Sequence, residues 1–286
     1  MIKGEDMKKG KVIHLDGYRL HYLEEGRGET VLLVHGLGSY SFTWRHNIKA
    51  LAPHYHVLAV DLKGFGFSDK PKGPGYSLDH HVQSIKQFLD ALGLTQVHYI
   101  GSSMGGEIGM RLCLEAPHMI DKLVLIGSSG YRDWIPLYIR ILCRLPYKFI
   151  VEPFIKRKYV TKQVLMKFVK AAFYNPAAIS DRELERYLIP MTDEAFDRSF
   201  LSLLKEFDFG KRKADYHQIQ HETLILAGEK DVVITHKDSV RLSAELGNAT
   251  MITIPQTGHF LHEERPDLVN QIILEFFSGL VSEGKE

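Results

Sequence analysis

Short apolar runs alternate with segments of helical periodicity along most of this 286-residue chain. Six runs rich in Val, Ile and Leu cover residues 30–34, 56–60, 97–101, 122–126, 223–227 and 251–254. Strands that are apolar on both faces are typical of a parallel sheet buried between helices. Helices are expected over residues 42–51, 78–92, 103–116, 237–246 and 266–280. The alternation predicts an α/β fold with a mostly parallel central sheet, helices on both faces, and ligand sites at the carboxyl ends of the strands.

Two regions depart from this alternation. Residues 11–15 and 18–24 predict two strands around the turn Asp16-Gly17, which would start the sheet in antiparallel fashion. Residues 131–216 have helical spacing and many aromatic side chains, but no convincing strand pattern. We therefore expect a core domain of residues 1–130 and 217–286, with a helical cap, residues 131–216, inserted after the sixth strand.

A Gly-x-Ser-x-Gly pattern joins the strand at 97–101 to the helix that follows it. Its central residue, Ser103, is our candidate nucleophile, because a catalytic serine needs an exposed position at a sharp strand-to-helix turn. Gly101 and Gly105 make such a tight turn sterically possible. Ser102 is not the centre of the pattern, since it has no glycine two positions before it.

The strand at 30–34 runs into His35-Gly36-Leu37-Gly38, a turn that can aim backbone N–H groups into a site. A serine nucleophile needs two such donors where negative charge develops on the substrate. We nominate the amides of Leu37 and of Met104, the residue after the nucleophile, as this oxyanion hole. For the His35 side chain we favour a structural role in the turn.

Two further strand ends supply a carboxylate and an imidazole. Asp231 follows the strand at 223–227 and can orient a histidine and stabilise its cation, although a turn or a helix cap is an alternative role for it. Glu229 is a near competitor and Asp133 a more distant one. His259 follows the last strand and is our general base, selected over His262 by its position at the strand end and by the preceding Gly258.

The chain order Ser103, Asp231, His259 is the order associated with α/β-hydrolases. With these motifs and the loop Asp61-Leu62-Lys63-Gly64-Phe65-Gly66-Phe67-Ser68-Asp69, the chain resembles the α/β-hydrolase fold superfamily over nearly its whole length. The resemblance implies a mainly structural role for that loop. It also implies carbonyl chemistry, because the dehalogenases and epoxide hydrolases of this fold use an aspartate nucleophile where this chain has Ser103.

Within the serine branch, the resemblance extends both to carboxylesterases and monoacylglycerol lipases and to the C–C hydrolases of aromatic ring-fission products. The C–C hydrolases commonly carry Asn before the serine and Trp after the histidine, whereas this chain has Ser102 and Phe260. We therefore expect a carboxylic ester hydrolase that forms an acyl-enzyme. A C–C hydrolase and a ligand-binding signalling protein on the same fold are the alternatives.

The expected cap carries enough aromatic surface to roof an apolar substrate pocket. His35, Gly36, Trp134, Tyr138 and Phe260 are the residues we expect to line it. The expected substrate is a small-molecule ester with a small or medium apolar group. The expected mechanism requires no metal or organic cofactor. The clustered pairs His54/His56 and His80/His81 lack the accompanying ligand spacing of a metal site, and we expect them to be solvated or helix-end histidines.

Composition excludes several other functions. Lys and Arg number 36 against 35 Asp and Glu, so no broad positive field would gather nucleic acid. The N-terminus has no apolar core, and prolines and charges interrupt the most apolar stretch, 135–155, so neither an export signal nor a transmembrane segment is predicted. With only Cys113 and Cys143 present, both are expected to be reduced in a cytoplasmic protein.

Overall fold

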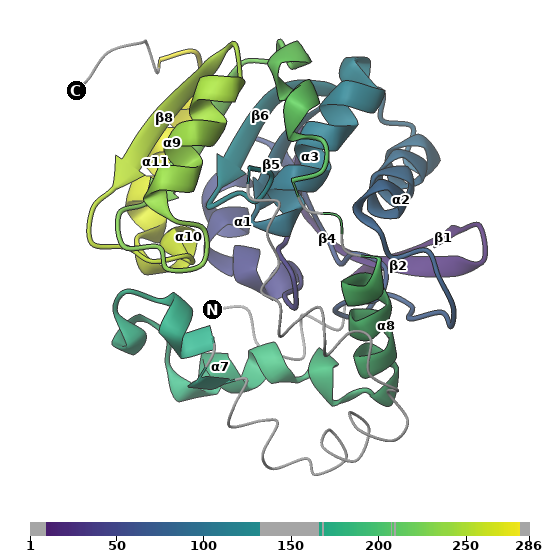
Figure 1. The fold of residues 1–286 in the computed structure, drawn as a ribbon. Coiled ribbons are helices and arrows are strands. Elements are labelled where there is room, and N and C mark those ends of the chain that lie inside the picture. The colour runs from purple at the N-terminus through teal and green to yellow at the C-terminus, as the bar shows by residue number, and fades with distance from the viewer. Residues whose placement is uncertain (1–9, 132–165, 168, 207, 209, 281–286) are drawn as a thin grey trace.

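The computed structural model describes residues 10–131, 166–167, 169–206, 208 and 210–280. Its centre is an eight-stranded sheet in the order β1-β2-β4-β3-β5-β6-β7-β8 (Figure 1). The strands are β1 (Lys11–Leu15), β2 (Tyr18–Glu25), β3 (Thr30–Val34), β4 (His56–Val60), β5 (Val97–Ser102), β6 (Ile120–Ile126), β7 (Thr223–Gly228) and β8 (Ala249–Ile254). All neighbours from β4 to β8 are parallel, whereas β1 pairs antiparallel with β2, and β2 antiparallel with β4.

Alternate residues of the central strands pack against helices on opposite faces of the sheet. In β3, Leu32 and Val34 join the apolar cluster that includes residues of α2 (Leu78–Ala91), α3 (Met104–Glu115) and α9 (His236–Glu245). Val31 and Leu33 join the cluster that includes residues of α1 (Arg45–Leu51) and α11 (Pro266–Phe277). The predicted mostly parallel sheet with helices on both faces is therefore confirmed.

The helix and strand bounds differ from the prediction by a few residues. The segment predicted as one helix over 42–51 is a 3-10 turn, η2 (Ser41–Trp44), followed by α1. The strand predicted at 122–126 begins two residues earlier, at Ile120, after the 3-10 turn η3 (Pro117–Met119). The last helix ends at Phe277 rather than at residue 280, and the short helix α10 (Leu261–Glu264), which follows His259, is not predicted.

Between β6 and β7 the described chain is helical. We call residues 166–218, where described, the insert. It contains η4 (Pro176–Ala178), α7 (Asp181–Leu188), η5 (Pro190–Thr192), α8 (Glu194–Lys205) and η6 (Lys213–Gln218). In Figure 1, α7 and α8 lie beyond the end of the sheet toward which the strands β6 and β8 point. The insert thus lies next to the carboxyl ends of the parallel strands.

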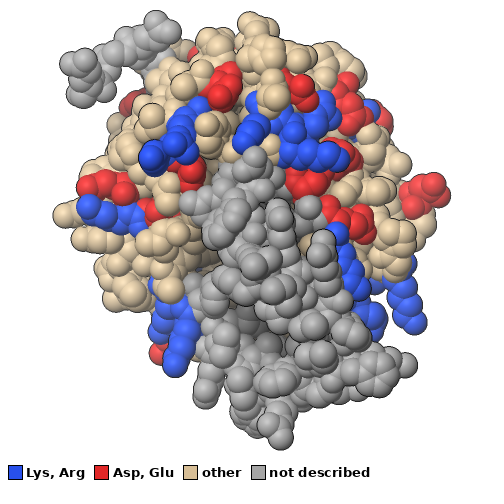
Figure 2. Space-filling model, viewed as in Figure 1, with Lys and Arg blue, Asp and Glu red and all other residues tan. Residues whose placement is uncertain are grey.

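Charges of both signs are interspersed over the face drawn in Figure 2, outside its grey atoms. This mixture matches the formal net charge of +1 for the sequence. A search of the helices in the described part of the chain finds none with the length and apolarity that a membrane span requires.

Candidate active site

The turn from β5 into α3 holds Ser103 in a conformation that side chains rarely adopt. Its φ is 52° and its ψ is −118°, which costs a non-glycine residue on the order of 1–3 kcal/mol. A β-carbon on Gly101 would lie 2.4 Å from the Gly105 carbonyl oxygen, and one on Gly105 would lie 2.2 Å from that of Val34. Both glycines of the motif are therefore required by close backbone approach, and the sharp turn leaves Ser103 partly exposed. Ser102, in contrast, is the buried last residue of β5.

The backbone of Ser103 is fixed on both sides. Its N–H donates to the Ile126 carbonyl at 3.0 Å, and its carbonyl accepts from the Ser129 N–H at 3.1 Å. Ser129 Oγ in turn donates to Glu107, a buried glutamate in the first turn of α3. The strained turn is thus held by the end of β6 and by its own helix.

Asp231 and His259 form a buried pair at the ends of β7 and β8. His259 Nδ1 lies 2.8 Å from Asp231 Oδ2, and both residues are 6% exposed. Asp231 Oδ1 accepts from the N–H groups of Val233 and Ile234 at 2.7 and 2.9 Å. Because both oxygens of the carboxylate are occupied by donors, Nδ1 carries the proton and the other imidazole nitrogen, Nε2, is left as a base.

The end of β6 connects this pair to the serine turn. Ile126 binds the Ser103 N–H, and a β-carbon on the next residue, Gly127, would lie 3.2 Å from His259 Nδ1 and 3.3 Å from Asp231 Oδ2. Among the hydrogen bonds of the described residues, none joins Ser103 Oγ to the His259 ring, whose partner is Asp231. The three predicted triad residues therefore lie around the dipeptide Ile126-Gly127. The hydrogen bond between Asp231 and His259 is already formed.

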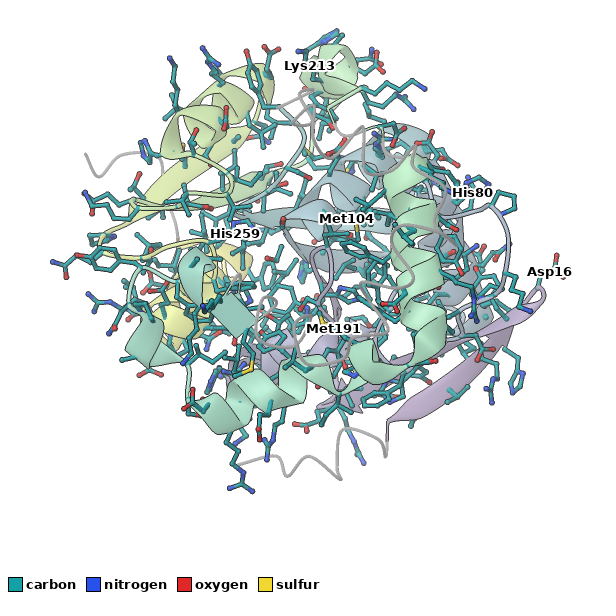
Figure 3. All side chains as sticks on the ribbon, turned by 60° about the horizontal axis from the view of Figure 1, so that its bottom comes forward. Asp16, His80, Met104, Met191, Lys213 and His259 are labelled. Carbon is teal, nitrogen blue, oxygen red and sulfur yellow. The ribbon has the colours of Figure 1, made fainter. Side chains whose placement is uncertain are left out.

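The glycine turn after β3 lies against Ser103. A β-carbon on Gly36 would be 3.0 Å from Ser103 Cβ, and the turn is closed by a bond from the Ser39 N–H to the Gly36 carbonyl. Gly38 has a φ of 71°, and a β-carbon there would meet Met191 and Phe200 of the insert at 3.7 and 4.0 Å. Met104, His259 and Met191 all lie in the central part of Figure 3, where the insert faces the end of the sheet. Among the described residues, the Leu37 and Met104 N–H groups have no protein acceptor.

The predicted pocket residues divide into three groups. His35 is fully buried: its Nε2 accepts from the Leu62 N–H at 3.0 Å and its Nδ1 donates to the Gly36 carbonyl at 2.8 Å. Burial lowers its pKa, so the ring is a neutral brace between two loops. Phe260 stacks on Phe173 of the insert, with centroids 4.9 Å apart. Trp134 and Tyr138 lie outside the described residues.

The competing candidates have other partners. Glu229 is exposed, accepts from the Gln256 N–H and pairs with Lys230. His262 is fully buried and bonded to Thr43 through its Nε2. Asp133, like Cys143, falls outside the part of the chain that is described. Within that part, no group of three or more His, Cys, Asp or Glu side chains is arranged to hold a metal ion.

The loop after β4 is held together by Asp61. This buried carboxylate accepts from His21 Nδ1 and from the N–H groups of Ser41 and Phe67, at distances between 2.7 and 2.9 Å. Burial alone would raise the Asp61 pKa, but the hydrogen bond and charge of His21 outweigh it and lower the pKa. These contacts are structural, as the resemblance implied.

Comparison with known proteins assigns the chain to a family. The model of the alpha/beta hydrolase fold matches residues 29–266. The chain belongs to the α/β-hydrolase fold family. The uncharacterized hydrolase YugF of Bacillus subtilis is 29% identical over 91% of this chain and 93% of its own length. Haloalkane dehalogenase 2 of Mycobacterium tuberculosis is 27% identical over 91% of each chain.

Among solved structures, a single-residue mutant of a meta-cleavage product hydrolase, CumD, is similar with a TM-score of 0.79. It is 27% identical, and the match covers 94% of this chain and 98% of that one. Membership of this family therefore supports hydrolase activity for the chain. The named relatives act on different kinds of bond. The fold alone does not select a substrate. The substrate of this α/β-hydrolase must therefore be inferred from its candidate nucleophile and base.

Proposed function

We propose that this α/β-hydrolase is a serine hydrolase that cleaves carboxylic esters through an acyl-enzyme. The observation that carries the proposal is the buried Asp231–His259 pair, which lies beside the dipeptide that binds the strained Ser103 turn. An activated serine requires a base whose orientation is fixed by a third group. The strain at Ser103 is a second support, since such conformations persist where function requires them.

In the proposed reaction, Nε2 of His259 takes the Ser103 proton as Oγ attacks the ester carbonyl carbon. Asp231 holds the proton on Nδ1 and stabilises the imidazolium. The N–H groups of Leu37 and Met104 hold the negative oxygen of the tetrahedral intermediate. Collapse returns the proton to the leaving alcohol and leaves the acyl group on Oγ. Water, deprotonated by the same imidazole, then releases the acid and restores Ser103.

A hydrogen bond between Ser103 Oγ and His259 Nε2 must form before Oγ attacks the carbonyl carbon. Such hydrogen bonds commonly tighten only when substrate is bound. The backbone of the turn is fixed by Ile126 and Ser129, so we propose that rotation of the Ser103 side chain about its Cα–Cβ bond brings Oγ to Nε2. The apolar residues Met191, Phe200 and Phe260 near the site favour an ester with a small or medium apolar group.

The decisive experiment compares Ser103→Ala with Ser102→Ala on nitrophenyl acetate and butyrate. Ser102→Ala is the matched control. Ser102 is buried at the end of β5, and its replacement by alanine should leave the turn unchanged. Loss of about 10³-fold or more in kcat for Ser103→Ala alone, with a fluorophosphonate probe labelling Ser103 in the wild-type protein, supports the proposal. Labelling of another residue, or turnover retained by Ser103→Ala, contradicts it.

The similarity to the meta-cleavage product hydrolase favours one second candidate, hydrolysis of a C–C bond in a vinylogous diketone acid. Ser102 and Phe260, where such enzymes commonly carry Asn and Trp, favour the ester instead. The two are separated by kcat/KM: a ring-fission product cleaved faster than any ester of the panel would replace the ester assignment while keeping the same triad.

A further inference from the structure

One carboxylate joins the loop that carries His259 to the insert. Glu264, the last residue of α10, accepts the Gly258 N–H at 2.7 Å. The same side chain accepts the N–H groups of Tyr174 and Asn175 of the insert at 3.2 and 3.0 Å. Three backbone donors from two segments about 85 residues apart in sequence therefore end on one half-buried group.

The two segments also touch directly. The backbone N–H of His259 donates to the Ala172 carbonyl at 2.7 Å. A β-carbon on Gly258 would lie 2.4 Å from that oxygen and 2.6 Å from the Tyr174 nitrogen. Phe260 stacks on Phe173 at 4.9 Å between ring centroids. The residues before, at and after the candidate base are thus each in contact with residues 172–174 of the insert.

The buried imidazole of His259 is oriented by one hydrogen bond and by packing. Of the described residues, Asp231 is the one hydrogen-bond partner of the His259 ring. The Phe260 ring packs edge-on against the imidazole with centroids 5.6 Å apart, and the position of the imidazole also depends on its own backbone, which Glu264 and Ala172 hold. A base that must transfer a proton to and from Ser103 needs its position fixed to a fraction of an ångström.

We propose that Glu264 is a positioning residue for the general base, and that it makes the position of His259 depend on how the insert packs against the His259 loop. The proposal rests on the function proposed above for His259. Substrate contacts that move the insert would thereby be transmitted to the base through the Glu264 carboxylate, without any contact between substrate and Glu264.

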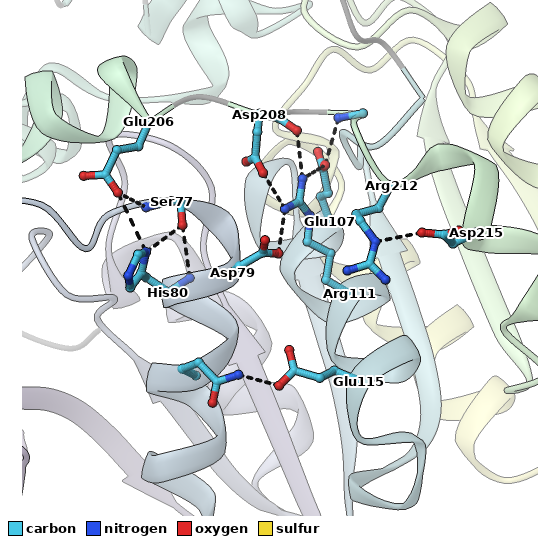
Figure 4. A network of polar contacts seen from close by, with 12 residues as sticks. Ser77, Asp79, His80, Glu107, Arg111, Glu115, Glu206, Asp208, Arg212 and Asp215 are labelled. Carbon is cyan, nitrogen blue, oxygen red and sulfur yellow. Dashed lines mark hydrogen bonds and ion pairs between the residues drawn. The ribbon is translucent and has the colours of Figure 1, made fainter.

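A second glutamate provides a matched control. Glu206, just after α8, accepts the N–H groups of Gly75, Tyr76 and Ser77 at 3.0 to 3.2 Å and lies beside His80 at the start of α2 (Figure 4). It is half-buried like Glu264, and it also joins the insert to the core through three backbone donors. Its partners belong to the loop before α2, not to the His259 loop.

The test compares Glu264→Ala, Glu264→Gln and Glu206→Ala on the nitrophenyl ester used above. Glu264→Ala should lower kcat about tenfold to a hundredfold and change KM by less than about threefold. Glu264→Gln keeps one carbonyl oxygen for the Gly258 and Tyr174 donors and should recover most of that loss. Glu206→Ala should keep kcat within about twofold of the wild-type value, because its anchor lies away from the base.

Amide hydrogen exchange gives a readout that needs no turnover. Glu264→Ala should accelerate exchange in residues 256–260 and 172–175 together, whereas Glu206→Ala should accelerate it in residues 75–77. Equal losses of kcat in both alanine variants, or faster exchange at 172–175 without a change at 256–260, would overturn the proposal. If Glu264→Ala does not fold, Glu264→Gln carries the test through a smaller loss of kcat and faster exchange at Asn175. Failure of the ester assignment would show separately, as no ester turnover by the wild-type protein.

Discussion

Three glycines around Ser103 are required for different reasons, and the differences are visible only at the scale of single residues. Gly101 and Gly105 have backbone oxygens at 2.4 and 2.2 Å from where a β-carbon would be. Gly127 instead has a φ of 49°, and a β-carbon there would crowd the Asp231–His259 pair. The Gly-x-Ser-x-Gly pattern allows the first two to be predicted, whereas the contact of Gly127 depends on strands far apart in sequence.

Replacing Gly105 tests whether the turn is as tightly packed as the distances indicate. Gly105→Ala should destabilise the fold by about 1–3 kcal/mol, because the carbonyl of Val34 is backbone and cannot rotate away. Gly247→Ala is the control, since a β-carbon there meets nothing within 4 Å. Urea unfolding followed by far-UV circular dichroism measures both. Equal stability of the two variants would show that the turn can accommodate a β-carbon at position 105, which would contradict these distances.

The Asp231 carboxylate sets the tautomer of His259, and Asp231→Asn tests this. The amide oxygen can keep the donors of Val233 and Ile234, which turns the amide NH₂ toward Nδ1. The ring must then accept at Nδ1 and carry its proton on Nε2, where it cannot act as base. We expect kcat on the nitrophenyl ester to fall by about 10⁴-fold with a nearly unchanged melting temperature. A loss below about tenfold would remove Asp231 from the mechanism.

At the scale of elements, the apolar runs predict the strands well because parallel strands are buried on both faces. Every residue of β3, for example, is buried. The helix predicted over 42–51 fails at its start, where Phe42, Thr43 and Trp44 are all buried and form a 3-10 turn. Periodicity distinguishes an apolar face from a polar one, and it loses that signal where every side chain is inside.

The first turn of α2 shows the same limit for the pair His80 and His81. The sequence predicts solvated or helix-end positions for both, and both do lie in that turn. His81, however, is fully buried, and neither of its ring nitrogens has a partner among the described residues. Burial, with Lys63 nearby, lowers the pKa of His81 to about 3. Sequence spacing alone does not reveal which of two adjacent histidines faces the core.

The buried His81 should make stability fall in acid. Because its folded pKa of about 3 lies below the ordinary 6.5, the unfolded chain binds a proton that the folded chain does not, and stability is lost as the pH falls from 6.5 toward 3. The contribution is about 2–3 kcal/mol between pH 7 and pH 4.5. His81→Leu should flatten the profile by this amount in urea unfolding. His14→Gln, at an exposed histidine of β1, should leave the slope unchanged, and identical slopes in all three proteins would refute the assignment.

For the whole molecule, the union of the insert with the core could not be predicted from the sequence. A buried cluster joins Arg45 of α1 and Glu263 of α10 to Glu183 and Tyr187 of α7. A second joins Glu107 and Arg111 of α3 to Asp208 and Gly210 of the insert (Figure 4). The hydrogen-bonded partners that come from different elements of these clusters lie between 76 and 218 residues apart in sequence. The positions of charged residues in the sequence also give no periodic signal of burial. The grouping of Ser103, Asp231 and His259 at one end of the sheet, in contrast, could be predicted, because each of these residues follows a strand whose position is evident.

We expect the cluster around Glu263 to stabilise the packing of the insert against the core. Glu263 is completely buried and Arg45 nearly so; burial alone would lower the Arg45 pKa, but Glu263 and Glu183 raise it above its usual value. Arg45→Met would leave the Glu263 charge in the interior with hydroxyl donors alone, from Thr43 and Tyr187. We expect a loss of about 3–5 kcal/mol in the free energy of unfolding.

Adding Glu263→Gln to Arg45→Met should return part of that loss, because no uncompensated charge remains. The coupling energy between the two sites should then exceed about 1 kcal/mol in a double-mutant cycle measured by urea unfolding. The exposed arginine–carboxylate pair of Arg19 and Asp69 is the control. Arg19→Met should have a much smaller effect, since solvent screens that pair. Equal effects at Arg45 and Arg19, or additivity within the cycle, would mean that the buried cluster does not hold the insert on the core.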